Sequence, residues 1–415
     1  MATVLGDQAA LGERLDLPAD RVMITAEDRP GDSSLPAVAD PTVDHVDGEL
    51  ARRRADVDAK HQQVINFLDE HGLEGVLLGR ADSIAWFTSG GELGQTYASD
   101  GAAVFVYATR TTRAVLADNV QSARVFEEEV AGLGFQLKER PWYQDPSRII
   151  AELTHNKAVA SDIPWPELRF EADRLLALRR SLSPRERQIL RALGRTLTLA
   201  IEATCRNFQP GETEADVAGH LAHRLIREGV VPVDLRVASD DRLARFRQPT
   251  FKAVEIRHRA TITATGRRHG LCASATRTVS FGCVDADFRA RHAVAAMVDA
   301  TCIYFSRPGE PVSEVFRRAR RIYEKLEHPH EWELDDQGFL IGYAAREGSL
   351  HPDSATILRP HSALCWSPSV GAARSEDTIV VDARGFEVVT EAQSWPKFEV
   401  SVKGFTIPRP GILER

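Results

Sequence analysis

The sequence lacks the long apolar run that a membrane-spanning helix requires, which is about 18 or more consecutive apolar residues. Its start, MATVLGDQAALGERLDL, also lacks the basic segment followed by an apolar core that is typical of a secretory leader. The chain contains no run of Lys and Arg long enough to form a polybasic patch, and its net charge is −8. We therefore expect a soluble, cytoplasmic protein that binds neither membranes nor nucleic acid.

Cysteine is scarce, and the chain lacks the C-x-x-C spacing of many zinc and redox sites. The five cysteines are Cys205, Cys272, Cys283, Cys302 and Cys365. This pattern favours buried thiols in a reducing compartment over disulfides, with a catalytic cysteine as the alternative. A Gly-rich phosphate loop and a G-x-S-x-G elbow are also missing. The expected partners are a small-molecule substrate and a second copy of the chain.

The length of 415 residues, of which 43% are hydrophobic, predicts two domains. Residues 1–48 are rich in Asp, Pro, Gly and Ala, which indicates an irregular extension. Residues 49–178 are predicted to form a first domain, and residues 179–415 a second.

The first domain is predicted to open with a helix that buries Val57, Val64, Phe67 and Leu68 and ends at Gly72. A buried strand follows, LEGVLLG, and then RADSIAWFTSGG, which we expect to form a strand and a turn. The segment VQSARVFEEEVAGLG predicts a second helix.

In the second domain, Ser183-Pro184-Arg185-Glu186 is typical of a helix start, with a hydroxyl N-cap, Pro at the first turn and Glu placed for a capping box. Thr213 and Asp216 predict another capped helix. Two β-rich segments, roughly 231–282 and 358–390, bracket a second pair of helices at 284–305 and 312–327.

Three segments of this domain occur in a distinctive order. They are ATITATGRRHGLCASATRTVSFG at Ala260–Gly282, DQGFLIGYAAREG at Asp336–Gly348 and SEDTIVVDARGFEVVT at Ser375–Thr390. In this order and spacing they resemble the pita-bread superfamily of aminopeptidase P, prolidase, methionine aminopeptidase and creatinase. The resemblance implies an α+β fold, with a small α/β creatinase-type N-terminal domain followed by a pita-bread domain of duplicated ααββ order.

Proteases of that superfamily hold two metal ions with two Asp, one His and two Glu. At the matching positions, this chain has Thr263 and Ser274 instead of Asp, and Phe339 instead of His. Ser367 replaces the first Glu, and only the last Glu has a counterpart, Glu376. One carboxylate among hydroxyl groups and a phenyl ring does not suit two divalent ions. We therefore expect no metal and no other cofactor.

The resemblance places these positions around one pocket, together with Arg346 and Glu347, which match the R-E dipeptide of a creatinase-like subgroup. We expect Glu376, Arg346 and Glu347 to be catalytic, with the Arg346 guanidinium gripping a substrate carboxylate. The alternative for Arg346 and Arg277 is a structural ion pair with Glu347 or Glu376. The expected substrate-binding residues are Thr263, Ser274, Arg245, Arg247, Gln248, Phe339, Tyr343, Trp366, Ser367 and Trp86.

Gln248 stands where the resemblance implies a His that shuttles a proton in creatinase, and an amide cannot do this. The prediction is a metal-independent enzyme that acts on a small polar, carboxylate-bearing nitrogen compound by C–N hydrolysis or elimination. Two alternatives are a non-catalytic pseudo-peptidase that binds or assembles other molecules, and a metallopeptidase with displaced ligands. The creatinase-like resemblance also implies a homodimer whose active site is shared between subunits.

Overall fold

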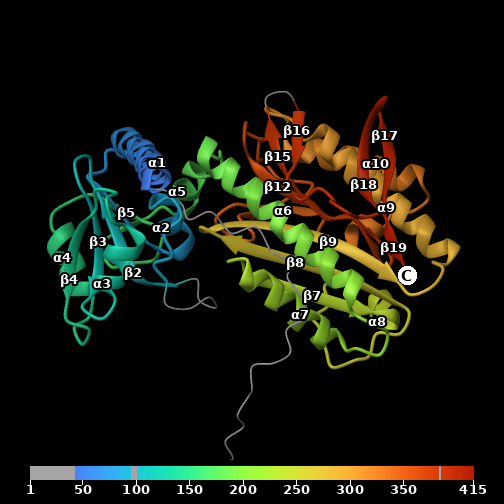
Figure 1. The fold of residues 1–415 in the computed structure, drawn as a ribbon. Coiled ribbons are helices and arrows are strands. Elements are labelled where there is room, and N and C mark those ends of the chain that lie inside the picture. Colours follow the sequence, from blue (N-terminus) through green and yellow to red (C-terminus); the bar gives the residue numbers. More distant parts are fainter. Residues whose placement is uncertain (1–42, 95–100, 383–384) are drawn as a thin grey trace, which may run out of the picture.

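The computed structural model describes residues 43–94, 101–382 and 385–415. Figure 1 shows a smaller N-terminal body in blue and teal beside a larger body that runs from green to red. The predicted extension, residues 1–48, lies mostly outside the described residues, and helix α1 (Val43–His71) already includes its last part. None of the helices in the three described ranges combines the length and the apolar composition needed to cross a membrane.

The N-terminal body is built on a six-stranded sheet in the order β4-β3-β2-β1-β5-β6. Its strands are β1 Gly75–Arg80, β2 Gly101–Ala108, β3 Arg113–Asp118, β4 Gln136–Arg140, β5 Val159–Ser161 and β6 Arg169–Phe170. Helices α4 (Ser147–Thr154) and α5 (Ala172–Leu178) complete it. As predicted, α1 buries Val57, Val64, Phe67 and Leu68. The helix is followed by Gly72 with a φ of 62°, a left-handed conformation that glycine adopts without steric cost.

Two local predictions in this domain were wrong. The segment after β1 is a helix, α2 (Ala81–Phe87), and not a strand. Residues 83–87 are all buried, so the segment lacks the alternation of buried and exposed residues that a half-buried strand shows. In the first turn of the helix, the Asp82 carboxylate accepts a hydrogen bond from Ser83 N at 2.7 Å. The helix predicted at 120–134 is only α3 (Ser122–Arg124) and a π-helical turn (Val125–Glu129).

The C-terminal body contains a nine-stranded sheet, with the main order β11-β10-β12-β15-β9-β8-β7, while β16 pairs with β15 and β19 pairs with β9. Its strands are β7 Val231–Ser239, β8 Arg259–Arg268, β9 Leu271–Ser280, β10 Gly338–Leu340, β11 Gly348–Ser349, β12 Ala363–Trp366, β15 Asp377–Asp382, β16 Gly385–Val388 and β19 Ile412–Glu414. The hairpins β13–β14 (Ser369–Val370, Ala373–Arg374) and β17–β18 (Lys397–Val402, Phe405–Pro410) stand apart. The helices are α6 Pro184–Asn207, α7 Glu214–Arg227, α8 Asp240–Arg245, α9 Ala286–Phe305 and α10 Val312–Lys325, with a 3₁₀ turn at Glu331–Glu333.

The order of a helix pair, strands, a second helix pair and further strands confirms the duplicated pita-bread arrangement. Both predicted helix starts are also confirmed, because Ser183 forms a capping box with Glu186, and Thr213 forms one with Asp216. Local side-chain hydrogen bonds define such starts, which makes them visible in the sequence.

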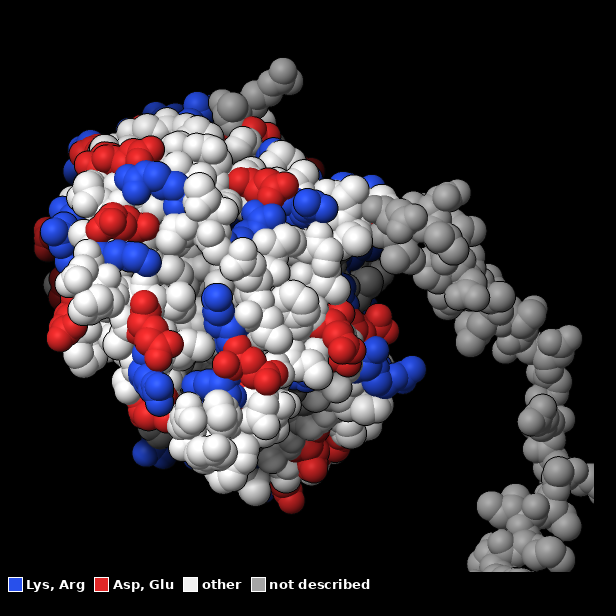
Figure 2. All heavy atoms as spheres, turned by 90° about the vertical axis from the view of Figure 1, so that its left-hand side faces the viewer, with Lys and Arg blue, Asp and Glu red and all other residues white. Residues whose placement is uncertain are grey.

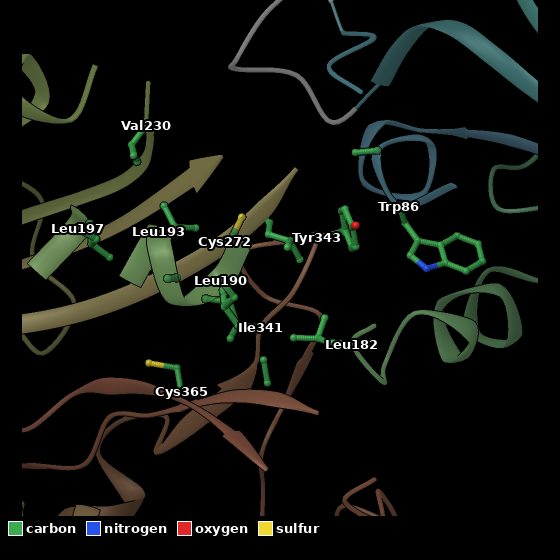
Figure 3. Packing of buried hydrophobic residues seen from close by; sticks show 14 of the residues in the cluster. Trp86, Leu182, Leu190, Leu193, Leu197, Val230, Cys272, Ile341, Tyr343 and Cys365 are labelled. Atoms are coloured by element: carbon green, nitrogen blue, oxygen red, sulfur yellow. The ribbon is translucent and has the colours of Figure 1, made fainter. Parts of the chain in front are cut away.

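The core of the C-terminal body forms where α6 packs on the long hairpin β8–β9. Figure 3 shows Leu190, Leu193 and Leu197 of α6 beside Cys272 of β9, with Ile341 and Cys365 nearby. The helix lies so close to the segment after β16 that a Cβ atom on Gly194 would overlap the Val389 carbonyl oxygen. On the outer face drawn in Figure 2, acidic and basic residues are interspersed, without a broad area of one sign.

Candidate functional site

A cavity of about 1210 Å³ lies where the two domains meet. Six of the residues predicted from the sequence line this main cavity: Thr263, Ser274, Phe339, Tyr343, Arg346 and Glu376. Residues of the N-terminal domain, among them Arg80, Asp82 and Ala85, line it as well. These six predicted positions of the C-terminal domain are thus brought together, and the N-terminal domain completes the enclosure.

Hydroxyl groups of the hairpin β8–β9 form part of the cavity wall. Side chains of a strand alternate between its two faces, so every second residue of each strand points to the same side. Thr263 lies opposite Thr276, with 2.6 Å between their Oγ1 atoms, and the Thr265 hydroxyl donates to Ser274 Oγ at 3.0 Å. Thr263 and Ser274, the positions at which the resemblance implies Asp in the superfamily proteases, are therefore neutral members of a hydroxyl ladder.

Glu376 precedes β15 and is 3% exposed, with its carboxylate next to this ladder. Its Oε1 accepts from the Ser274 hydroxyl at 2.6 Å. Its Oε2 accepts from Ser367 Oγ at 2.7 Å and from Thr276 Oγ1 at 3.2 Å. Three neutral donors thus orient a single carboxylate, and the nearest cation is Arg374, with 3.9 Å between Nη1 and Oε2.

Arg374 joins Glu376 to the loop that carries the sequence-predicted segment 245–248. It donates to the Ser367 hydroxyl and to Asp335, and its Nη2 donates to the Arg247 carbonyl oxygen at 3.0 Å. Gln248 Nε2 donates to Asp335 Oδ1 at 2.6 Å. Gln248 therefore holds an acidic residue behind the site and does not line the main cavity.

Arg346 is an exposed member of the cavity wall. Its guanidinium carbon lies 4.3 Å from the centre of the Phe339 ring, and Nη1 forms an ion pair with Asp336. This pair partner is neither Glu347 nor Glu376, so the sequence alternative named the wrong partners for Arg346. The predicted alternative also misassigned Arg277, which is fully buried and pairs with Asp377 at 3.1 Å.

Glu347 does not line the cavity. Its Oε2 accepts from Arg179 at 2.8 Å, and Arg179 Nη2 donates to Asp82 Oδ2 at 2.8 Å. Both Asp82 and Glu347 are largely buried, with side chains that are 10% and 6% exposed. Through Arg179, Glu347 therefore connects the C-terminal domain to Asp82 of the N-terminal domain. This structural role stands in place of the predicted catalytic one.

Two predicted aromatic residues belong to the core instead of the cavity wall. Trp366 is fully buried, and its Nε1 donates to Ser306 Oγ at 2.9 Å. Trp86 is 3% exposed and packs beside Phe87, with the ring centres 6.0 Å apart. Arg245 is also off the cavity, since it is exposed and stacks on Phe246 with its guanidinium carbon 5.3 Å from the ring centre.

Four arginines that line the cavity were not predicted from the sequence: Arg80 and Arg124 of the N-terminal domain, Arg236 of β7 and Arg267 of β8. Arg236 pairs with Asp234. No ion pair of Arg267 within 4 Å is found in the described part of the chain, although its charge acts on the Glu92 carboxylate, which also lines the cavity. The two-residue spacing of Thr263, Thr265 and Arg267 places all three on one face of β8, and this spacing was a usable signal.

A buried polar cluster fixes the N-terminal domain against the cavity wall. Lys60 of α1 is 2% exposed, and its Nζ lies 2.7 Å from Asp56 and 2.6 Å from Glu186 of α6. The Tyr343 hydroxyl accepts from Lys60 at 3.2 Å and donates to Glu186 Oε1 at 2.7 Å. Burial, and next the Glu186 carboxylate, raise the pKa of Tyr343 well above its usual value, so this wall residue stays a phenol.

Cys272 is the one predicted cysteine candidate that lines the main cavity. Burial raises the pKa of its thiol to about 12. The thiolate is the nucleophilic form, so the cavity environment gives Cys272 no nucleophilic activation. In the same wall, hydrogen bonds and the charge of Arg179 outweigh the opposing effect of burial and hold the pKa of Asp82 well below its usual range.

The groups around Glu376 are poor ligands for metal ions. In the described part of the chain, no three His, Cys, Asp or Glu side chains converge closely enough to hold a metal ion. The groups at this place are one carboxylate and the hydroxyls of Thr263, Ser274, Thr276 and Ser367. These residues do not fit a pair of divalent ions, which need several charged oxygen or imidazole ligands.

Comparison with known proteins places this geometry among described folds. Residues 188–383 match the model of metallopeptidase family M24. No match is found among curated protein sequences.

Solved structures match over nearly their whole length. The Xaa-Pro dipeptidase from Bacillus anthracis has a TM-score of 0.69 at 18% identity, covering 81% of this chain and 98% of that one. The X-Pro aminopeptidase from Thermotoga maritima has a TM-score of 0.70 at 16% identity, covering 86% and 99%. The N-terminal domain of FACT complex subunit SPT16 from chickpea, Cicer arietinum, has a TM-score of 0.64 at 13% identity, covering 83% and 97%. At these identities the likeness is one of fold.

Proposed function

We propose that this chain, whose residues 188–383 match the model of metallopeptidase family M24 and whose fold resembles that of Xaa-Pro dipeptidase, is an enzyme on a peptidase scaffold that has become independent of metal. Its substrate is a small polar nitrogen compound that bears a carboxylate, and its reaction is hydrolysis or elimination at a C–N bond. The observation that carries this proposal is the environment of Glu376, a single carboxylate held by three hydroxyl donors beside a large interdomain cavity.

The proposal departs from the peptidase names of the structural neighbours because of the residues that surround Glu376. Ser274 and Ser367 stand at two of the matching ligand positions, and each donates a hydrogen bond to the carboxylate. A hydroxyl that donates to a carboxylate is a protonated, neutral group and not an anionic ligand for a divalent ion. The catalytic step is therefore assigned to proton transfer at Glu376.

The arginines of the cavity wall supply the proposed carboxylate binding. Arg267 forms no ion pair within 4 Å among the described residues, and Arg346 is 39% exposed beside Phe339. A guanidinium offers a planar fork of N–H donors that matches the two oxygens of a carboxylate. A substrate anchored there places its nitrogen-bearing end toward Glu376.

In the hydrolytic form of the reaction, Glu376 Oε takes a proton from a water molecule whose oxygen attacks the carbon of the C–N bond. The same carboxyl then returns this proton to the leaving nitrogen as the bond breaks. Ser274 and Ser367 keep the carboxylate in one orientation throughout. In an elimination, Glu376 removes a proton from the carbon next to the C–N bond, and the electron pair of that C–H bond forms the new double bond. The electron pair of the C–N bond leaves with the nitrogen, which takes up the proton from Glu376.

A non-catalytic binding protein is the second candidate, and one observation favours it. Both oxygens of the Glu376 carboxylate already accept hydrogen bonds from hydroxyl groups, which leaves fewer lone pairs free to take a proton from a substrate. The structural neighbour named as a FACT complex subunit has a similar fold. Under this candidate, the same cavity binds its ligand without turnover.

A homodimer in the cytoplasm, with the active site shared between subunits, remains part of the proposal. A metallopeptidase with displaced ligands is the remaining alternative, and the donor set around Glu376 speaks against it.

The test combines metal analysis with turnover. After dialysis we expect less than one equivalent of Mn, Fe, Co or Zn per chain, and no hydrolysis of Xaa-Pro dipeptides with added Mn²⁺. A panel of guanidino, N-carbamoyl and N-methyl amino acids is then incubated with the wild type and with Glu376→Gln, and products are followed by mass spectrometry. Turnover by the wild type that falls by about 100-fold or more in Glu376→Gln supports the enzyme.

Other results select the alternatives. Saturable binding of a panel member without turnover favours the binding protein. One or more equivalents of tightly held metal, or Mn²⁺-dependent peptide hydrolysis, overturns the metal-independent proposal.

A further inference from the structure

A second, much smaller cavity of about 30 Å³ adjoins the main cavity. Arg236 and Thr263 line both cavities and form the wall between them. Two further arginines line the small cavity: Arg247, which follows α8, and Arg374 of β14. Three guanidinium groups from separate parts of the chain thus converge on a space that is large enough for one small ion.

The lining of the small cavity contains no Asp or Glu among the described residues. The acidic partners of the three arginines lie outside that lining. Arg236 pairs with Asp234, Arg247 with Glu331 at 2.7 Å, and Arg374 with Asp335. Glu376 also lies 3.9 Å from Arg374. These pairs make the accumulation of three cations tolerable, while the described residues that line the small cavity present guanidinium and hydroxyl groups but no carboxylate.

The three arginines also keep unused donors. Among the described residues, Arg236 donates only through Nη2, and Arg247 and Arg374 donate only through their Nη atoms. Each Nε–H therefore has no acceptor among the described residues. The hydroxyls of Thr261, Thr263 and Ser369 line the same space and add further polar contacts.

We propose that this small cavity is a binding site for a small monoanion. A volume of about 30 Å³ exceeds what a single water-sized particle requires, but it does not admit a phosphate-sized group with its hydration shell. The occupant is either a free halide or the carboxylate end of a molecule that lies mainly in the main cavity, because Arg236 and Thr263 contact both spaces. Guanidinium N–H donors favour both species for the same electrostatic reason.

This inference does not depend on the proposed function, because anion binding is measured without any turnover. The first experiment titrates chloride at constant ionic strength, with a bulky sulfonate as the replaced anion, and follows the thermal unfolding midpoint. A specific site gives a midpoint that rises with the logarithm of chloride above its Kd. Formate, the smallest carboxylate, is then added as a competitor to distinguish a halide site from one that also accepts carboxylates.

Two variants locate the effect. Arg247→Gln removes one of the three guanidinium groups and should weaken the apparent affinity for chloride by about tenfold or more. Arg257→Gln is the matched control, since Arg257 is 73% exposed, pairs with Glu255 at 3.7 Å and does not line the small cavity. The control should keep the wild-type affinity.

A crystal grown with bromide provides a second measurement that needs no variant. We expect an anomalous peak between Arg236, Arg247 and Arg374. An ordered water in that space, together with the absence of a chloride-specific rise of the midpoint, overturns the proposal. Equal chloride affinity in the wild type and Arg247→Gln, without the bromide peak, also overturns it.

Discussion

Replacing Lys60 by Met should strongly destabilise the contact between the two domains. The Lys60 side chain is 2% exposed, and its ammonium lies 2.7 Å from Asp56 and 2.6 Å from Glu186. Met retains most of the apolar stem but removes the positive charge that lies between these two carboxylates. Leaving buried carboxylates without a counter-charge costs on the order of 3–5 kcal/mol.

The structure indicates where in this range the result should fall. Asp56 still accepts from Ser89 Oγ at 2.7 Å, and Glu186 still accepts from the Tyr343 hydroxyl at 2.7 Å. These remaining hydrogen bonds reduce the penalty, so we expect about 3 kcal/mol at pH 7. The loss should shrink at acidic pH, where one of the two carboxyls takes up a proton instead of remaining unpaired.

The assay is urea unfolding of the wild type, Lys60→Met and the control Lys397→Met, followed by tryptophan fluorescence. Lys397 pairs with Glu391 at 3.0 Å on the surface, where the side chains are 34% and 55% exposed. Such a pair contributes at most about 1 kcal/mol, so the control should unfold almost like the wild type. If Lys60→Met loses no more stability than Lys397→Met, the buried cluster does not hold the domains together and the reasoning fails.

Two further predictions concern titration and ligand binding. Burial, and next the charge of Arg409, lower the pKa of His292 to about 4 from the usual 6.5. Between these two pH values the imidazole is therefore protonated in the unfolded chain but stays neutral in the folded chain. Stability from this residue is therefore complete above pH 6.5 and is lost as the pH falls toward 4, and His292→Phe should flatten that part of the profile of unfolding midpoint against pH. A profile unchanged by the substitution would contradict this assignment. Arg346→Ala should leave the unfolding free energy within about 1 kcal/mol of wild type, because the ion pair of Arg346 with Asp336 is exposed. The same substitution should weaken the affinity for carboxylate ligands by about 30-fold or more. Arg317→Ala, which breaks another exposed pair with Glu314, is the control, and a loss of stability without a loss of binding would reject the role of Arg346.

The fold was largely predictable because its signals are local and ordered along the chain. Ser183 and Thr213 predict helix starts because their capping partners are only three residues away, and both capping boxes are present. The helix at Ala81–Phe87 was missed because its residues are buried on all sides, so no periodic pattern of polar residues marks it. Trp366 was assigned to the cavity for a related reason, since a sequence shows that a Trp is apolar but not which wall it faces.

The site was predictable only in its C-terminal half. The resemblance to the pita-bread superfamily implied that residues 263, 274, 339 and 376 lie around one pocket, and all four line the cavity. Lys60, Asp82 and Arg179 come from the other domain or from the connection between the domains, and their partners are distant in sequence. Ion pairs of this kind carry no periodicity, so neither the closure of the cavity by the N-terminal domain nor the tie from Arg179 to Glu347 could be derived from the chain alone.

The substitutions around Glu376 are also consistent with one another in electrostatic terms. If Ser274 and Ser367 were carboxylates, their oxygens would face Glu376 at the present hydrogen-bond distances of 2.6 and 2.7 Å, and only cations between them would relieve the repulsion. As hydroxyls they donate to Glu376 instead, which leaves one negative charge with Arg374 at 3.9 Å. Replacing one acidic residue by Ser reduces the repulsion that a metal ion would have to offset. Each such replacement also adds a hydroxyl donor to the carboxylate that remains. The present set of residues therefore forms a stable hydrogen-bonded centre without an ion, which is the physical reason to look for acid–base chemistry or ligand binding at Glu376 instead of metallopeptidase activity.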